Sequence, residues 1–321
     1  MDQVLAGLRP FNPGDIEALT RLLIAARAWP PAAVPAPEDV LLRWERRGVN
    51  PPADVSVLPD DNGDLIAFAQ AVSFKDGTPR LAFELGVHPE NRRRGIGSAL
   101  YRMVTGRARG LAVAHLTSPV YRRDGEERPE STGFLERRGF RPDHSYWQLR
   151  LDEINRQPLP QWPGAIGVRT FRGDDRDAET WARLIVEAFG EAATAEGIRA
   201  QMREPGVSPD GYFFAVDLET GEEIGTSRGR IDMLGGKPVG YVGTVGVIPR
   251  YRGRGIATAL MGQTLAYLAG RGMCSATLFV EHRNIAARRL YDKLGWYSVY
   301  RTDHYWKRLE SDEEKADGRH R

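Results

Sequence analysis

The chain has 321 residues, with 45 Lys and Arg against 43 Asp and Glu, for a net charge of +2. This length predicts about two domains, and the interspersed charges argue against a nucleic acid or a membrane surface as partner. The single cysteine, Cys274, excludes an internal disulfide. Because the first residues lack a signal-peptide pattern and no apolar run approaches the roughly 20 residues of a membrane span, we expect a cytoplasmic protein.

Hydrophobic periodicity predicts alternating helices and strands in the first half of the chain. Pro13-Gly14-Asp15 is expected to start a helix that continues to Ala26. The loop that ends at Gly95 is expected to open another helix, with apolar residues on one face. The remaining predicted elements are helices at 38–46 and 132–138 and strands at 55–58, 65–73, 81–87, 112–118 and 146–151.

The second half repeats the same order of elements. Predicted strands lie at 212–216, 223–231, 239–247 and 276–280, and predicted helices at 181–189, at 198–202 and from about 255 and 286. Gly139-Phe140 in the first half corresponds to Gly295-Trp296 in the second. An internal repeat of this size predicts two similar domains.

The seam between the halves is predicted from punctuating residues. Pro158, Pro160, Pro163 and Gly164 fall in a polar stretch, which is typical of a linker. We therefore expect an N-terminal domain at 1–151, a linker at 152–165 and a C-terminal domain at 166–309. The charged residues 310–321 are predicted to form a disordered tail.

One short loop occurs twice, 160 residues apart, each time between an apolar strand and a helix. The first copy reads Val87-His88-Pro89-Glu90-Asn91-Arg92-Arg93-Arg94-Gly95-Ile96-Gly97, and the second reads Val247-Ile248-Pro249-Arg250-Tyr251-Arg252-Gly253-Arg254-Gly255-Ile256-Ala257. Unpaired backbone N–H groups at a helix N-terminus, aided by the helix dipole, favour an anion. The repeated pattern therefore predicts two phosphate-binding loops.

Individual residues of the loops suggest how a phosphate would bind. Gly95 and Gly255 allow unusual backbone angles, and the small Gly97 and Ala257 allow close approach. Arg92 and Arg252, with neighbours that include Arg94 and Arg254, are expected to add charge-assisted contacts. The spacing is neither that of a Walker loop nor that of a dinucleotide fingerprint. A tight turn that binds nothing and an Arg-rich nucleic-acid patch are the two alternatives.

The pattern Arg-x-x-Gly-x-Gly/Ala in both halves resembles the pyrophosphate loop of the GNAT superfamily of acyl-CoA-dependent N-acyltransferases. The resemblance implies an α/β (α+β) fold of two GNAT-like domains, each with helices around a mixed, mostly antiparallel sheet. A splayed central strand pair in each sheet would hold the pantetheine arm of acetyl-CoA, and its pyrophosphate would sit on the loop. The residues assigned to this binding are Val87, Arg92, Arg93, Arg94, Gly95, Ile96 and Gly97, and Val247, Arg252, Gly253, Arg254, Gly255, Ile256 and Ala257.

A second signature occurs in the C-terminal half only. The stretch from Asn284 through Leu290-Tyr291 to Gly295-Trp296 resembles the superfamily pattern Asn-x-x-Ala-x-x-Leu-Tyr-x-x-x-Gly-Phe. Asn284 is a predicted helix N-cap and, by the resemblance, a cofactor-binding residue. Tyr291 lies two turns later and, by the resemblance, protonates the departing CoA thiolate; the alternative is a core aromatic residue. In the N-terminal half, Leu135 stands where Tyr291 stands.

The general base is left open by the sequence. Glu281, at the end of the strand before Asn284, is the first candidate in the second half, ahead of Tyr241, His304 and Asp232. In the first half, Glu84 lies where the superfamily often has a base, and the alternative is an outward-facing strand charge. The scattered histidines show no metal-ligand spacing, so no metal is expected.

The sequence therefore predicts an N-acetyltransferase that moves the acetyl group of acetyl-CoA to a primary amine by direct attack in a ternary complex. The C-terminal half is the expected catalyst, and the N-terminal half a degenerate copy that binds CoA. One alternative is a non-catalytic acyl-CoA-binding or sensing protein. Another is an enzyme similar to mycothiol acetyltransferases, although this chain has Tyr241 where that resemblance leads us to expect an acidic residue. The acceptor, a small-molecule or protein amine, and the choice between monomer and homodimer are left open.

Overall fold

The computed structural model describes residues 3–74, 79–123, 125–126, 129–204 and 206–309. Contacts divide them into two compact units, each described here by itself. Unit 1 comprises the described residues up to Trp147 with Glu281–Arg283 and those from Val299 onward, and unit 2 comprises Gln148–Val280 and Asn284–Ser298. The predicted tail at 310–321 lies outside the described residues. Within the described part of the chain, no helix is long and apolar enough to cross a membrane.

Unit 1 has a mixed sheet with helices on both faces. Its strands are β1 (Arg9–Pro10), β2 (Val55–Pro59), β3 (Leu65–Phe74), β4 (Arg80–Val87) and β5 (His115–Arg123), and its helices are α1 (Ile16–Ala25), α2 (Pro37–Arg46), α3 (Pro51–Asp54), α4 (Ile96–Gly110) and α5 (Glu130–Glu136). The strands pair antiparallel except for β4 and β5, which are parallel. Strand β12 (Tyr297–Arg308) completes the sheet by pairing antiparallel with β5 from Tyr300 to Arg308.

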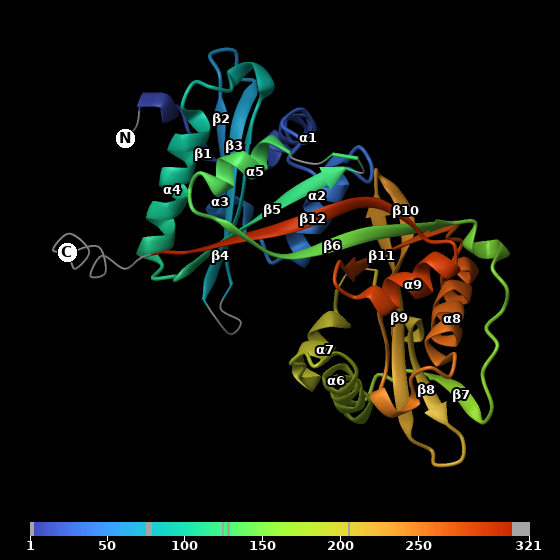
Figure 1. Cartoon of the computed structure of the whole chain (residues 1–321). Coiled ribbons are helices and arrows are strands. Elements are labelled where there is room, and N and C mark those ends of the chain that lie inside the picture. The colour runs from blue at the N-terminus through green and yellow to red at the C-terminus, as the bar shows by residue number, and fades with distance from the viewer. Residues whose placement is uncertain (1–2, 75–78, 124, 127–128, 205, 310–321) are drawn as a thin grey trace. The chain divides into compact units, whose positions relative to one another are not determined.

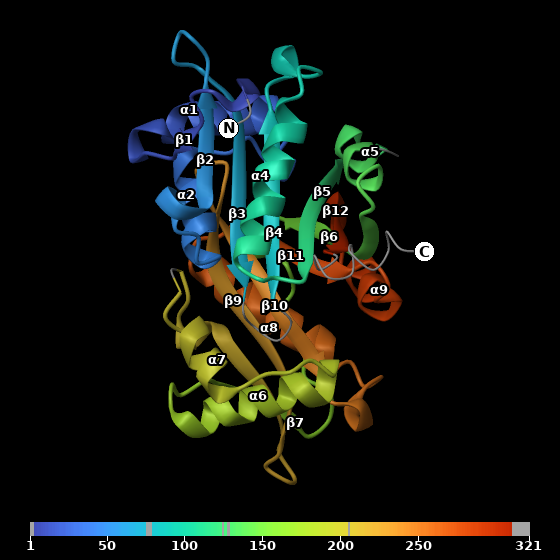
Figure 2. The ribbon, with the colours of Figure 1, turned by 90° about the vertical axis from the view of Figure 1, so that its left-hand side faces the viewer.

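Alternating side chains place two cores on this sheet. Ala67 and Ala69 of β3 pack in the core that includes α4, whereas Phe68 and Val72 pack in the core that includes α1 and α2. Because successive side chains of a strand point to opposite faces, β3 is buried on both faces of the sheet. Figure 2 shows α4 lying along the strands of unit 1.

Unit 2 repeats this arrangement. Its strands are β7 (Ile166–Thr170), β8 (Tyr212–Asp217), β9 (Glu223–Leu234), β10 (Lys237–Val247) and β11 (Ser275–Glu281), and its helices are α6 (Asp175–Phe189), α7 (Ala195–Gln201), α8 (Ile256–Gly270) and α9 (Ile285–Lys293). Only the β10–β11 pair is parallel among these strands. In Figure 1, α8 lies on one side of the strands β8–β10, and α6 and α7 lie on the other. The predicted fold class is confirmed in both units.

The faces of β9 point to different helices. Ser227 bonds the Thr264 hydroxyl of α8 at 2.8 Å, and a Cβ on Gly229 would lie 3.0 Å from Thr264. The neighbouring Arg228 lies on the opposite face and reaches Gln201 of α7. The sheet of unit 2 therefore has an α8 face and an α6–α7 face.

Several predicted bounds shift in the structure. The strand predicted at 112–118 is β5, His115–Arg123, and the helix predicted from Thr132 begins at Glu130. Strand β12 was not predicted, because its arginines and histidine interrupt the apolar alternation. β12 begins in unit 2 and completes the sheet of unit 1, while β6 (Arg141–Asp152) begins in unit 1 and ends in unit 2. A cut of the chain at 152–165 would therefore separate β12 from the sheet that it completes.

Candidate functional site

The two repeated loops have the same backbone geometry. The φ angles are +83° at Gly95 and +82° at Gly255, and +63° at Arg93 and +78° at Gly253. Helix α4 begins at the residue after Gly95, and helix α8 begins at the residue after Gly255. The first N–H groups of each helix therefore point out of the strand end without an intrahelical acceptor, an arrangement suited to a phosphate.

Arg92 and Arg252 hold their loops in equivalent ways. The Nε of Arg92 donates to the Val87 carbonyl at 3.2 Å, and its Nη2 donates to the Ala26 carbonyl at 3.4 Å. The Nε of Arg252 donates to Val247 at 3.1 Å, and its Nη2 donates to Ala188 at 2.7 Å. Each guanidinium thus joins the loop to a strand end and to the C-terminal end of α1 or α6. Its contact with a phosphate stays a prediction.

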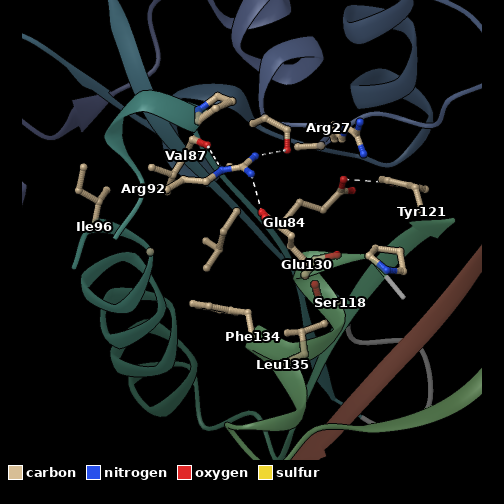
Figure 3. A pocket seen from close by; sticks show the side chains of 18 of the residues that line it. Arg27, Glu84, Val87, Arg92, Ile96, Ser118, Tyr121, Glu130, Phe134 and Leu135 are labelled. Carbon is tan, nitrogen blue, oxygen red and sulfur yellow. Dashed lines mark hydrogen bonds and ion pairs between the residues drawn. The ribbon is translucent and has the colours of Figure 1, made fainter. Parts of the chain in front are cut away.

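A cavity of about 810 Å³ lies beside the first loop, within unit 1 (Figure 3). It extends from the loop residues Arg92–Gly97 to the inner ends of β4 and β5. β4 and β5 pair only from Arg80–Ala82 to His115–Thr117. Beyond this fork they line the cavity with Phe83–Val87 and with Ser118, Pro119 and Tyr121. The cavity thus connects the first loop to the part of β4 and β5 where the two strands no longer pair.

Charged and hydroxyl side chains connect the two strands at the fork of unit 1. Glu84 of β4 accepts from Arg43 at 2.8 Å and from Arg47 at 3.1 Å. Its other oxygen accepts from the Tyr121 hydroxyl of β5 at 3.1 Å, and Arg43 also donates to that hydroxyl. The side chains of Arg43 and Glu84 are only 15% and 12% exposed. We call these four residues the Glu84 cluster; both carboxylate oxygens already have partners.

The place in unit 1 that corresponds to Tyr291 is taken by a leucine, as the sequence indicates. Leu135 of α5 is 3% exposed and lines the cavity, as Figure 3 shows. A leucine has no proton to donate to a thiolate. The geometry of unit 1 therefore suits binding better than catalysis.

Tyr291 and Asn284 lie on α9 in unit 2. The Asn284 side chain accepts from the Ala287 N–H at 3.1 Å, so the predicted N-cap is confirmed. Tyr291 is 8% exposed and its ring lies 6.1 Å from that of Trp296. Burial, and then the nearby Tyr241, raise the pKa of Tyr291 to about 12. The phenol is therefore fully protonated near neutral pH and available as a proton donor.

The central strand of unit 2 contains a β-bulge that unit 1 lacks. Between the pairs Gly243–Arg228 and Gly246–Thr226 the register shifts by one residue. Thr244, inside the bulge, has a φ of +55°, which is rare for a β-branched residue. In unit 1, β4 pairs with β3 in unbroken register from Arg80 to Val87. Bulges of this kind leave one residue out of the ladder and often lie beside active sites.

The remaining base candidates occupy different places. Glu281 is the last residue of β11 and falls with unit 1, whereas Tyr291 falls with unit 2, so their pairing stays a prediction. His304 of β12 stacks on His144 with ring centroids 4.5 Å apart. Burial, and then His144, lower the pKa of His304 to about 4. Asp232 lies near Arg230 at 3.6 Å. In the described part of the chain, no group of three or more His, Cys, Asp or Glu could hold a metal ion.

Sequence reasoning missed the arginines that approach these sites from other elements. Arg43 of α2 and Arg228 of β9 lie within helical and strand patterns that identify them only as polar positions. The sequence does contain one indication of the bulge, namely the glycines at 243 and 246 within an apolar strand. No local pattern shows which distant carboxylate an arginine will meet.

Comparison with known proteins places the chain in a family. Residues 178–296 match the "Acetyltransferase (GNAT) family" and residues 52–142 match the "Acetyltransferase (GNAT) domain". A mycothiol acetyltransferase of Thermobispora bispora is 32% identical over 294 residues, which are 89% of this chain and 93% of that protein.

Solved structures agree with this assignment. A GCN5-related N-acetyltransferase from Sphaerobacter thermophilus has a TM-score of 0.77 and 26% identity, covering 95% of this chain and 96% of that one. A tandem GNAT protein from the clavulanic acid biosynthesis pathway shares the fold, with a TM-score of 0.73 and 22% identity over 95% of this chain and 99% of that one. The chain belongs to the GNAT family of acetyltransferases, with two GNAT domains in tandem.

Proposed function

We propose that unit 2 transfers the acetyl group of acetyl-CoA to a primary amine by direct attack within a ternary complex. The observation that carries this proposal is the position of Tyr291, a buried phenol with a pKa raised to about 12, two turns into a helix capped by Asn284. The loop from Arg252 to Ala257 supplies the N–H groups for the CoA pyrophosphate. Asn284 is assigned to the same bound cofactor.

The proposed step is balanced by two proton transfers. The neutral amine attacks the acetyl carbonyl carbon, and the carbon–sulfur bond then breaks with its electron pair on sulfur. Tyr291 gives its phenolic proton to that sulfur, and the attacking amine loses a proton to a base, for which Glu281 is our candidate. A phenol with a raised pKa stays protonated until the thiolate forms.

For unit 1 we propose acyl-CoA binding without turnover. The cavity beside Arg92–Gly97 has the space, whereas Leu135 cannot act as an acid and the Glu84 cluster connects the strands where an acceptor would approach. A general-base role for Glu84 stays a second candidate, since its carboxylate lies at the fork. The whole protein would thus have two binding sites and one catalyst.

The class of amine that accepts the acetyl group is proposed from the relatives and from the panel of amines that such enzymes could use. The mycothiol acetyltransferase name of the relatives makes a mycothiol-type amine one candidate, and amino acids, polyamines and protein amines are others. The test is CoA release from acetyl-CoA over a panel of these amines, together with calorimetry of acetyl-CoA binding. We expect two bound molecules per chain and turnover with one class of amine. Tight binding without acetylation of any amine would leave only the non-catalytic acyl-CoA-binding alternative.

A further inference from the structure

An arginine on the α6–α7 face of unit 2 forms no direct ion pair with the described residues. Arg228 of β9 donates to the Gln201 amide oxygen at 2.7 Å and to the Tyr212 hydroxyl at 3.1 Å. Both partners are neutral. Its buried Nε has no partner, and over the described ranges no carboxylate lies within 4 Å of its guanidinium. The side chain is only partly exposed.

The carboxylates of this region are held by a different arginine. Arg230, two residues along the same face, pairs with Glu204 at 3.1 Å and with Asp232 at 3.6 Å. Burial by itself lowers the pKa of Arg228, but Tyr212, Tyr241 and the more distant carboxylate of Glu204 together outweigh it, so the group stays cationic. A half-buried charge whose direct partners are all neutral is unfavourable for folding unless a ligand compensates it.

The position of Arg228 in the sheet relates it to the proposed reaction. It is the register partner of Gly243, directly before the bulge at Thr244. A Cβ at Gly243 would lie 3.0 Å from the Arg228 Nε and 2.9 Å from the Tyr241 ring. Gly243 is not among the positive-φ glycines, so it is glycine because Tyr241 and Arg228 pack where a side chain would lie, and not because of a turn. After burial, Tyr241 is in turn the second cause that raises the pKa of Tyr291.

We propose that Arg228 binds an anionic group, a carboxylate or a phosphate, on the acceptor amine, so that unit 2 acetylates acidic amines. A guanidinium offers paired donors that match either anion. The acceptor's charge would supply an anion in direct contact with the guanidinium, beside the bulge, where the direct partners of Arg228 are neutral. This inference rests on the proposed acetyl transfer by unit 2.

The test compares amines that differ only in the anionic group. Standard L-amino acids are assayed against their carboxamides, and O-phosphoethanolamine against ethanolamine, which separates the carboxylate from the phosphate. We expect the anionic member of one pair type to be preferred by about 10- to 100-fold in kcat/KM, the range of a charged hydrogen bond. Equal or better use of the neutral members, or of a neutral mycothiol-type amine, would overturn the inference.

Substitutions separate a binding role from a structural one. Arg228→Met should reduce the anionic-to-neutral preference toward one, mainly through KM, and Arg228→Lys should restore part of it. Arg199→Gln, at an exposed arginine of α7, is the matched control and should leave the preference unchanged. An Arg228→Met enzyme that loses activity equally with both members of each pair would show that Arg228 only supports the fold.

A binding measurement decides the inference even without turnover. Calorimetry of CoA-saturated protein with the same pairs should show Arg228-dependent binding of the anionic member. If such binding occurs but no amine is acetylated, the proposed function fails and the anion site stands. If acetylation occurs but binding ignores the anionic group, the anion site fails and the proposed function stands.

Discussion

The hydroxyl of Tyr121 donates to the carboxylate of Glu84 at 3.1 Å and so connects β5 to β4 where their backbones have separated. Arg43 donates to both groups. The proposed acceptor side of unit 1 is therefore occupied by the protein's own side chains. In unit 2, a bulge at Thr244 lies at the position equivalent to Glu84.

Removing the charge of Glu84 should weaken the fold without weakening catalysis. Glu84→Gln leaves the mostly buried Arg43 without its carboxylate, which should cost about 2–4 kcal/mol of unfolding free energy. Denaturant unfolding measures the loss, and steady-state acetylation measures the activity. Arg47→Gln, at the more exposed partner, is the milder control. A large fall in kcat at unchanged folding would instead make Glu84 a base.

Tyr291→Phe should remove the proton donor and leave the cofactor site intact. Loss of a general acid lowers rates by about 10²- to 10⁴-fold, so we expect a fall of this order in kcat with unchanged acetyl-CoA binding. Leu135→Tyr, at the equivalent place in unit 1, should not restore the rate of Tyr291→Phe, because the Glu84 cluster occupies the place where an acceptor would approach that fork. Wild-type kcat in Tyr291→Phe would exclude the assigned role.

Matched substitutions in the two loops should separate the sites. Gly97→Val and Ala257→Val each place methyl groups where a phosphate would approach the helix N-terminus. In calorimetry, Gly97→Val should lower the number of acetyl-CoA molecules bound per chain from two to one, and kcat should be retained. Ala257→Val should remove the other molecule and the activity. Full activity with Ala257→Val, or its loss with Gly97→Val alone, would reverse the assignment of the catalytic half.

Stability should fall in mild acid because His304 resists protonation. Burial, and then His144, lower its pKa to about 4 in the fold, whereas the unfolded chain binds the proton near 6.5. The folded state therefore binds fewer protons between these values, so stability is complete above about pH 6.5 and is lost as the pH falls toward 4. Allowing for the partial exposure of His304, we expect the free energy of unfolding to fall by roughly 2 kcal/mol over this pH range. Denaturant unfolding of His304→Gln should show a flatter pH profile; an unchanged slope would exclude His304 as the source.

Because strand β12 completes the sheet of unit 1, folding of the N-terminal half should depend on the C-terminal residues of the chain. A fragment of residues 1–152 leaves the edge of β5 without the partner that spans Tyr300–Arg308, and unpaired edges promote aggregation. We expect poor folding by circular dichroism and proteolysis. The same fragment with residues 297–309 joined through a flexible linker should recover. Cooperative melting of residues 1–152 alone would show that β12 is dispensable.

The fold was largely predictable because the repeat and the hydrophobic periodicity are local signals. The two loops were recognised from glycine and arginine spacing, and their shared φ angles follow from the same residues. Asn284 was predicted as an N-cap from the residues that follow it. Strand β12 was missed because its side chains alternate poorly, and its pairing partner lies far away in sequence.

What the sequence determined by itself is the repeated architecture, the two phosphate loops and the difference between Tyr291 and Leu135, since these depend on residue type and spacing. The tertiary structure alone decided which charges meet. It paired Glu84 with Arg43 and Tyr121, gave Arg230 its carboxylates and left Arg228 without one. Such pairings depend on which strands and helices fold against each other, because electrostatic and hydrogen-bond energies act over a few ångströms of space and not along the chain.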